Sequence, residues 1–142
     1  MVSEVKKEFR HSAKVHRLRN WCGLEAFDTL FNKRDYRAAE RFWSPKYIQH
    51  SSHIEPGRDG LFNLVKSLAT GSNWEHGIMM AEGDYVMIHS RYSHPDGSAM
   101  VVVDIMRIKE GVLEEHWDVI QPEGTKEESK SKLPMFGDHF PS

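Results

Sequence analysis

Apolar residues in the first half of the chain recur at the three- and four-residue spacing of helices. From Trp21 to Phe31 this spacing predicts an amphipathic helix. After a polar break, Asp35 can cap a second short helix, which we expect to end at Ser44-Pro45. A third helix is predicted after residues 56–60, with Gly71 just past its end. Its apolar positions are Leu61, Leu64, Val65 and Leu68.

The second half of the chain changes to the two-residue alternation of β-strands, after a short β-like segment at residues 47–50. Turns are predicted at residues 94–97 and 109–111, the second as a three-residue loop with Gly111 in a left-handed conformation. The predicted strands cover residues 74–80, 85–92, 99–109 and 112–121. Helices followed by consecutive antiparallel strands indicate an α+β fold. We expect a curved sheet that wraps over the N-terminal helices and encloses a pocket.

The composition is that of one globular domain. The chain has 142 residues, of which 28% are charged and 39% apolar, so it is long enough for a single core. We divide it into a basic extension (1–19), a folded domain (20–136) and a short tail (137–142). The extension is expected to be solvated. The alternative, an arm that binds nucleic acid or another partner, lacks supporting aromatic residues.

Charge and cysteine content limit the expected binding partners and cellular compartment of the protein. A net charge of −2 gives no general electrostatic reason to bind nucleic acid or an anionic membrane. No apolar run reaches the ~18 residues of a membrane span, and the basic N-terminus lacks the apolar segment of a signal peptide. The single cysteine, Cys22, fits a reducing compartment. We therefore expect a cytoplasmic protein.

Three titratable residues are predicted to share one face of the last hairpin. In the last strand, alternation places His116 and Asp118 on one side and Trp117 on the other. If the preceding loop has three residues, Asp104 lies directly opposite His116, close enough for a hydrogen bond. A simpler interpretation is a charge pair on a solvent-facing sheet, which would contribute about a few tenths of a kcal/mol.

The surroundings of Asp104 favour a buried site over that simpler interpretation. Residues 101–106 are all apolar except this acid. Because burial disfavours the charged form of a carboxyl group, Asp104 is expected either to pair with His116 or to stay protonated and donate a hydrogen bond.

Histidines are numerous, with nine in 142 residues. His50 ends the segment 47–50, and His53 lies in the loop after it. Together with His116 and Asp118 they could form a four-ligand metal set. Their spacing matches no zinc motif, and the sequence has no glycine-rich phosphate loop or nucleophile elbow. We therefore expect neither a metal nor another cofactor.

Several segments together carry a wider pattern. They are Tyr47-Ile48-Gln49-His50, Pro56-Gly57-Arg58-Asp59-Gly60-Leu61, Val102-Val103-Asp104-Ile105-Met106-Arg107, Gly111 with Glu115-His116-Trp117-Asp118-Val119, and Pro134-Met135-Phe136. They span about residues 20–136, and in combination this region resembles the SnoaL-like polyketide cyclase family of the NTF2-like superfamily. The resemblance implies an α+β cone, a curved antiparallel sheet around a deep pocket that the N-terminal helices close.

The resemblance also implies roles for single residues. Superfamily members include ketosteroid isomerases, scytalone dehydratase and aldol-type cyclases, which share proton abstraction next to a carbonyl. Asp104 is similar to the isomerase acid that donates a hydrogen bond to the oxyanion, and His50 falls where the isomerases have their general-base aspartate. The isomerases' oxyanion tyrosine would fall near Phe27, which has no donor. His116 and Asp118 form a polar pair of the kind that the SnoaL-like group tends to carry.

Residues and resemblance together predict a cofactor-independent enzyme that abstracts a proton next to a carbonyl. It would be an aldol-type cyclase, an isomerase or a dehydratase, acting on a small hydrophobic, polyketide-like or cyclic substrate. The catalytic candidates are His50, Asp104, His116 and Asp118, with His50 or Asp118 as the base. The substrate-binding candidates are Phe27, Trp43, Met100, Met106 and Ile120.

Two expectations concern partners. The alternative to an enzyme is a non-catalytic small-ligand-binding or dimerisation module, because one fold can host many functions. Trp117 and Val119 form an apolar outer side of the last strand, which favours a homodimer. Neither nucleic acid nor a membrane is expected as a partner.

Overall fold

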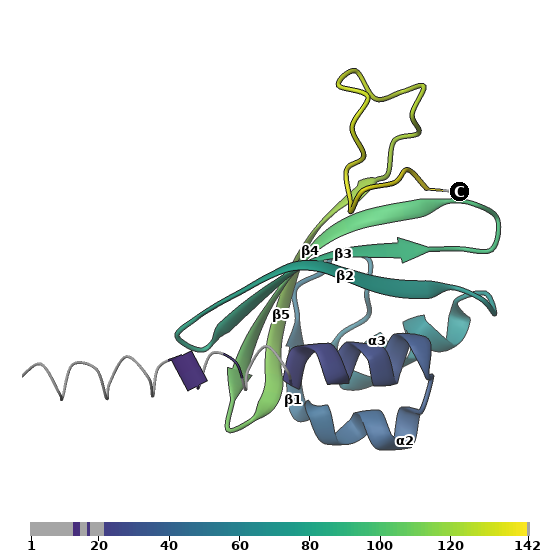
Figure 1. Ribbon diagram of the computed structural model, residues 1–142. Helices are drawn as coiled ribbons and strands as arrows, with labels where there is room; N and C mark the ends of the chain where they lie inside the picture. Colours follow the sequence, from purple (N-terminus) through teal and green to yellow (C-terminus); the bar gives the residue numbers. More distant parts are fainter. Residues whose placement is uncertain (1–12, 15–16, 18–21, 142) are drawn as a thin grey trace, which may run out of the picture.

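The computed structural model describes residues 13–14, 17 and 22–141, so the expected basic extension lies almost wholly outside the described residues. Five strands form one curved sheet (Figure 1). They are β1 (Trp43–Gln49), β2 (Asn73–Glu82), β3 (Tyr85–Ser93), β4 (Ala99–Lys109) and β5 (Val112–Pro122). Their spatial order is β1-β5-β4-β3-β2, with β1 parallel to β5 and the other neighbours antiparallel. The predicted α+β class is confirmed.

Helices cover one face of this sheet (Figure 1). Helical residues 22–27 continue into the π-helical turn η1 (Asp28–Asn32), and α2 (Tyr36–Ala39), the 3-10 turn η2 (Glu40–Phe42) and α3 (Gly57–Ser67) follow. Asp35 caps α2 as predicted, because its Oδ1 accepts the N–H of Ala38 at 3.0 Å. Within α3, a Cβ at Gly60 would lie 1.9 Å from the backbone oxygen of Glu55, so only glycine fits there.

Two predicted helix ends are wrong. Helical structure stops at Phe42, and the chain enters β1 at Trp43, which already pairs with Leu113 of β5. β1 is an edge strand, and an edge strand tolerates Pro45 because one side needs no N–H donor. Gly71 does not follow α3 directly. The helix ends at Ser67, and Gly71, with φ of +93°, lies in the turn before β2.

The core lies between the helices and the concave face of the sheet, and aromatic side chains fill much of it. The ring of Phe27 packs against Phe31 and Trp74, both at 5.4 Å between centroids, and against Trp43 at 6.1 Å. Burying such a side chain contributes roughly 1.5–3 kcal/mol. This packing fixes the N-terminal helix on the sheet and so builds one wall of the pocket described below.

The β4–β5 hairpin differs from the prediction in its loop and its register. The loop has two residues, Glu110 and Gly111, with φ of 51° and 80°, the left-handed pair that a tight hairpin prefers. Beyond the loop, Ile108 pairs with Leu113 but Arg107 pairs with Glu115. The predicted three-residue loop is therefore wrong, and so is the predicted register.

Glu114 is the extra residue of a β-bulge at this point. The shorter loop and the bulge each shift the pairing by one residue in the same direction, so the register changes by two and the side chains keep their faces. Asp104 lies opposite Asp118, not opposite His116, yet all three remain on the concave face. Leu113, next to the bulge, is fully buried.

The segment after β5, residues 123–136, is anchored to the sheet at both ends. Glu123 is buried and binds Arg91 with two hydrogen bonds, of 2.8 and 2.6 Å. Phe136 docks under the same arginine, 4.7 Å from ring centroid to guanidinium. Between them the tail forms a loop that projects beyond the sheet (Figure 1). None of the described helices is long and apolar enough to cross a membrane.

Candidate active site

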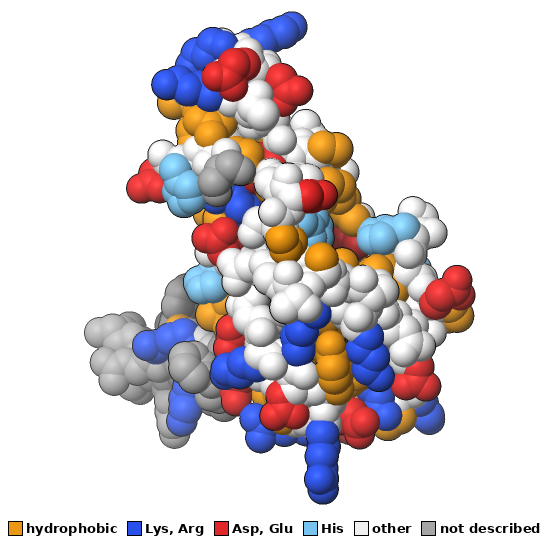
Figure 2. Space-filling model, turned by 90° about the vertical axis from the view of Figure 1, so that its right-hand side faces the viewer, with side chains coloured by type: hydrophobic (Ala, Val, Ile, Leu, Met, Phe, Trp, Pro, Cys, Tyr) orange, Lys and Arg blue, Asp and Glu red, His pale blue; other side chains and the backbone are white. Residues whose placement is uncertain are grey.

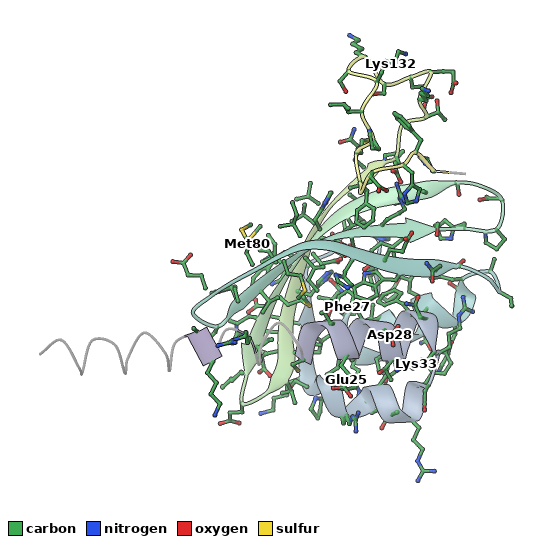
Figure 3. All side chains as sticks on the ribbon, viewed as in Figure 1. Glu25, Phe27, Asp28, Lys33, Met80 and Lys132 are labelled. Atoms are coloured by element: carbon green, nitrogen blue, oxygen red, sulfur yellow. The ribbon has the colours of Figure 1, made fainter. Side chains whose placement is uncertain are left out.

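A cavity of about 220 Å³ lies between the helices and the concave face of the sheet. Phe27 points from the N-terminal helix toward the sheet (Figure 3) and lines this cavity together with Met100 and Ile120, as predicted. Trp43 and Met106 do not line it. Both are almost completely buried in the core, where Trp43 packs on Phe62 and the Met106 methyl group lies close to Gly23. Their predicted role in substrate binding is therefore corrected.

Three of the four predicted catalytic side chains meet in the cavity. Asp104, His116 and Asp118 each offer an oxygen or nitrogen, and these atoms lie within 4.8 Å of one another. Asp104 and His116 are only 2% and 4% exposed. These three side chains form a polar cluster on β4 and β5, in a cavity wall made mostly of apolar residues.

The hydrogen bonds of His116 define where its protons lie. Its Nδ1 is 2.8 Å from Oε1 of Gln49, an oxygen that also accepts the backbone N–H of Ser51 at 2.9 Å. The amide nitrogen of Gln49 donates to the hydroxyl of Tyr47 at 3.2 Å, which fixes the orientation of the amide. Because an amide oxygen can only accept, Nδ1 of His116 carries a proton.

The second ring nitrogen of His116 shares a proton with Asp104. Nε2 lies 3.0 Å from Oδ1 of Asp104. One proton belongs between them: either His116 is a cation beside a carboxylate, or a neutral His116 accepts the proton of a neutral Asp104. In both states the pair has no net charge and holds one proton at the cavity wall.

The other oxygen of Asp104 is also bound. The hydroxyl of Tyr92 donates to Oδ2 at 3.0 Å. Burial raises the pKa of Tyr92 well above its usual value, and the Asp104 carboxylate raises it further, so this hydroxyl stays protonated and remains a donor. Asp104 is thus held from two sides, by His116 and by Tyr92.

Asp118 has a different environment. It faces Asp104 directly across the β4–β5 ladder, half-buried and lining the cavity. No hydrogen bond to its carboxylate is formed by the described residues. Its negative charge acts on the cavity, because it contributes to the raised pKa of both Tyr47 and Tyr92.

The prediction that His50 joins these residues in one cavity is wrong. Gln49 pairs with His116 across the β1–β5 ladder and turns its side chain to that histidine, so the next residue points the other way. The ring of His50 stacks on Trp117 at 4.7 Å, and its Nε2 lies 2.8 Å from Glu115 on the outer face. The inward position that the resemblance gave to His50 belongs to Gln49.

Sequence reasoning missed Gln49 and Tyr92 as parts of the site. A hairpin signal existed for Tyr92, but the predicted 94–97 turn gives the wrong register, with Tyr92 opposite Ala99. The observed connection, residues 94–98, pairs Tyr92 with Met100 and places it on the face of Asp104. Gln49 had no such signal, since its parallel pairing with β5 joins residues that are far apart in the chain.

The cavity residues also determine what could hold a metal. The atoms of Asp104, His116 and Asp118 are close enough together to hold an ion. Asp104 and His116, however, already hydrogen-bond each other, Tyr92 and Gln49, and only Asp118 is open among the three. The four-ligand metal set considered from the sequence, His50, His53, His116 and Asp118, does not form, because His50 lies on the outer face.

A curved sheet over N-terminal helices, with an acid–histidine cluster in the enclosed cavity, is the architecture of the NTF2-like proteins. Residues 24–116 match the SnoaL-like domain family, and the chain belongs to this family. No curated protein matches the chain.

Solved structures share the fold at low sequence identity. A candidate ketosteroid isomerase from Kribbella flavida is 13% identical with a TM-score of 0.68, covering 88% of this chain and 96% of that one. AclR, a candidate hydroxylase from Streptomyces galilaeus, is 23% identical with a TM-score of 0.61, covering 72% and 78%. A candidate polyketide cyclase from Bacillus cereus is 14% identical with a TM-score of 0.60, covering 68% and 70%.

Proposed function

We propose that this protein is a cofactor-independent enzyme that removes a proton next to a carbonyl group of a small hydrophobic substrate. The observation that carries the proposal is the contrast between two opposed carboxyl groups. Asp104 is bound by His116 and Tyr92, whereas Asp118 has no hydrogen-bond partner among the described residues. Environments that separate two carboxyl groups in this way assign one as acid and the other as base.

Asp118 is the base in this proposal, in place of His50. Its carboxylate takes the α-proton, and the electrons of the broken C–H bond move to the carbonyl oxygen to form an enolate. The proton between His116 and Asp104 then forms a second, bifurcated hydrogen bond to that oxygen. A general base contributes on the order of 10²–10⁴-fold to such a step, and an oxyanion donor about 10²–10³-fold.

The enolate has three possible fates with the same residues. Return of the proton to another carbon is an isomerisation, transfer to a departing hydroxyl is a dehydration, and attack of the enolate carbon on a second carbonyl is an aldol-type cyclisation. All three begin with the same proton transfer, which is therefore the step to measure. Apolar walls such as Phe27, Met100 and Ile120 suit a cyclic or polyketide-like substrate.

The test is hydrogen–deuterium exchange at the α-carbon of small cyclic ketones in D₂O, followed by NMR with the purified protein. We expect catalysed exchange that is suppressed by a saturated hydrocarbon of the same shape, because the hydrocarbon competes for the pocket. Ketones that bind without exchange would instead support the alternative, a non-catalytic ligand-binding module.

We further propose that two copies associate through the outer face of the sheet. Val119 is 67% exposed and Met80 58% exposed, and Met80 points away from the helices (Figure 3). Trp117 and the stacked His50 lie on the same outer face. Exposed apolar and aromatic side chains on one side of a sheet are typical of a protein interface.

A further inference from the structure

Besides the acid–histidine cluster, two further histidines line the cavity. His53, from the loop between β1 and α3, and His94, from the β3–β4 turn, both line the cavity. Figure 2 views the molecule from the side of this turn, where histidine side chains lie close to hydrophobic ones. Neither histidine has a part in the proposed proton transfer.

Each of these imidazoles is anchored by one nitrogen. Nδ1 of His53 lies 3.0 Å from the hydroxyl of Ser51, and Nδ1 of His94 lies 3.0 Å from the hydroxyl of Ser72. In both rings, Nε2 has no hydrogen-bond partner among the described residues. A serine hydroxyl can donate to Nδ1 or accept from it, so each ring can present an N–H to a ligand, whether it is neutral or cationic.

Few side chains can bring positive charge to the cavity. Apart from His116, which is bound to Asp104, the cavity-lining residues that can carry a positive charge are these two histidines.

The strand ladder separates His94 from the acid–histidine cluster. Tyr92 pairs with Met100, and His94 lies two residues further toward the turn, whereas Asp104 lies four residues in the other direction. Four strand residues span about 13 Å, and apolar Met100 and Val102 line the cavity between these positions. His94 and the acid cluster thus lie at different positions along the strands, with apolar residues between them.

We infer that the pocket takes a keto acid, a cyclic or aromatic ketone that carries a carboxylate at its far end. The inference rests on the proposed function for the position of the ketone at Asp118 and His116. The carboxylate would bind the free Nε2 atoms of His53 and His94. Repulsion from Asp118 keeps the carboxylate away from the acid cluster and so fixes the direction in which the ligand enters.

Binding of two matched probes tests the inference without any turnover. The probes are 4-acetylbenzoate and 4-acetylbenzamide, which have nearly the same shape and the same ketone but differ in charge. Calorimetry with the wild-type protein should show tighter binding of the acid by on the order of tenfold, the range of a charge-assisted hydrogen bond. Equal affinities, or tighter binding of the amide, would overturn the inference.

Substitutions test whether His53 and His94 cause the preference for the acid over the amide. His53→Ala with His94→Ala should remove the preference for the acid, so that the acid and the amide bind with similar affinities. His76→Ala, an exposed histidine that does not line the cavity, is the matched control and should keep it. A preference that survives in the double variant overturns the assignment to these two residues. If the double variant does not fold, the single changes to Gln are compared, and each should reduce the preference.

The two proposals can fail separately. The same acetyl group reports α-proton exchange by NMR. Exchange without a preference for the acid leaves the proposed function standing and overturns the keto-acid inference. A preference for the acid without exchange supports the inference about the ligand and contradicts the catalytic role.

Discussion

Asp104 and Asp118 lie directly opposite each other on β4 and β5, yet the hydrogen bonds of the described side chains reach only Asp104. Like charges in this position repel each other. The proton shared between His116 and Asp104 removes that conflict, because it leaves their pair without net charge next to an ionised Asp118. The same substitution, aspartate to asparagine, is therefore expected to act differently at the two positions: at Asp104 it removes an acidic proton, and at Asp118 it removes the base.

Asp104→Asn should keep the fold and slow catalysis. The amide can still donate to a neutral His116, so the free energy of unfolding should change little, but the shared acidic proton is lost. We expect α-proton exchange to fall by about 10²–10³-fold. NMR exchange rates and urea unfolding measure the two effects. A large loss of stability with normal exchange would mean that Asp104 is only structural.

Gln49 is expected to act as a positioning residue through His116. Gln49→Met removes the acceptor of both the His116 Nδ1–H and the Ser51 N–H, which should cost about 1–3 kcal/mol of stability. The ¹⁵N shifts of the His116 ring should no longer report a fixed Nδ1–H, and exchange should slow. Gln49→Glu keeps an acceptor and should retain the Nδ1–H signal. A fixed tautomer in Gln49→Met would contradict this role.

The last three strands of this protein were predictable because alternation is a local property. The predicted range of β4 is the observed one, and β3 and β5 differ from their predicted ranges by a single residue at the C-terminal end. The β4–β5 register was not predictable in the same way. It depends on a two-residue loop at Glu110 and Gly111 together with a bulge at Glu114, and each of these changes moves the pairing by one residue.

The site residues on the β4–β5 hairpin could be predicted from the sequence. The site residue on β1 could not, because its position depends on pairing between strands that are far apart in the chain. Asp104, His116 and Asp118 share a face because of parity, which survived the error in register. His50 was misplaced by one residue, since the sequence does not contain the parallel β1–β5 pairing that turns Gln49 inward. Trp43 and Met106 are apolar in the same way as Met100, and only packing separates core from cavity.

The buried pair of Arg91 and Glu123 should matter for stability. Their side chains are 3% and 0% exposed, and the arginine also donates to the backbone oxygens of Phe136 and His139. Arg91→Met leaves a buried carboxylate unpaired and should cost about 3–5 kcal/mol in urea unfolding. The double change with Glu123→Leu should recover most of this loss. A single-variant cost within about 1 kcal/mol, typical of surface pairs, would contradict the assignment.

Glu115 should make stability depend on pH in the acid range. Hydrogen bonds from His50 and Arg107 lower the pKa of Glu115 below its usual value of 4.5. The folded state therefore favours the charged form. This contribution is present above pH 4.5 and is lost as the pH falls through the lowered pKa. The stability difference between wild type and Glu115→Gln should shrink between neutral pH and a pH of about 3.

The neighbouring change Glu114→Gln is the control for that experiment. Urea unfolding over the same pH range measures both differences. If the difference for Glu115→Gln stays constant with pH, its carboxylate does not contribute to stability through ionisation.

Association through the outer face predicts a charge-sensitive dimer. Val119→Lys would bury a lysine at the contact and should shift sedimentation velocity from dimer to monomer. Leu133→Lys is a matched control, because Leu133 is 68% exposed against 67% for Val119 but follows Lys132, which lies on the projecting loop (Figure 3). A wild-type protein that sediments as a monomer at high concentration would exclude the proposed contact.

The most direct test of the central claim is the α-proton exchange rate of Asp118→Asn. Asp138→Asn, in the exposed tail, is the control, and each rate is measured with and without a metal chelator. The account predicts a loss on the order of 10²–10⁴-fold in Asp118→Asn, with ketone binding retained, normal exchange in Asp138→Asn and no effect of the chelator. Exchange in Asp118→Asn at the wild-type rate would contradict it.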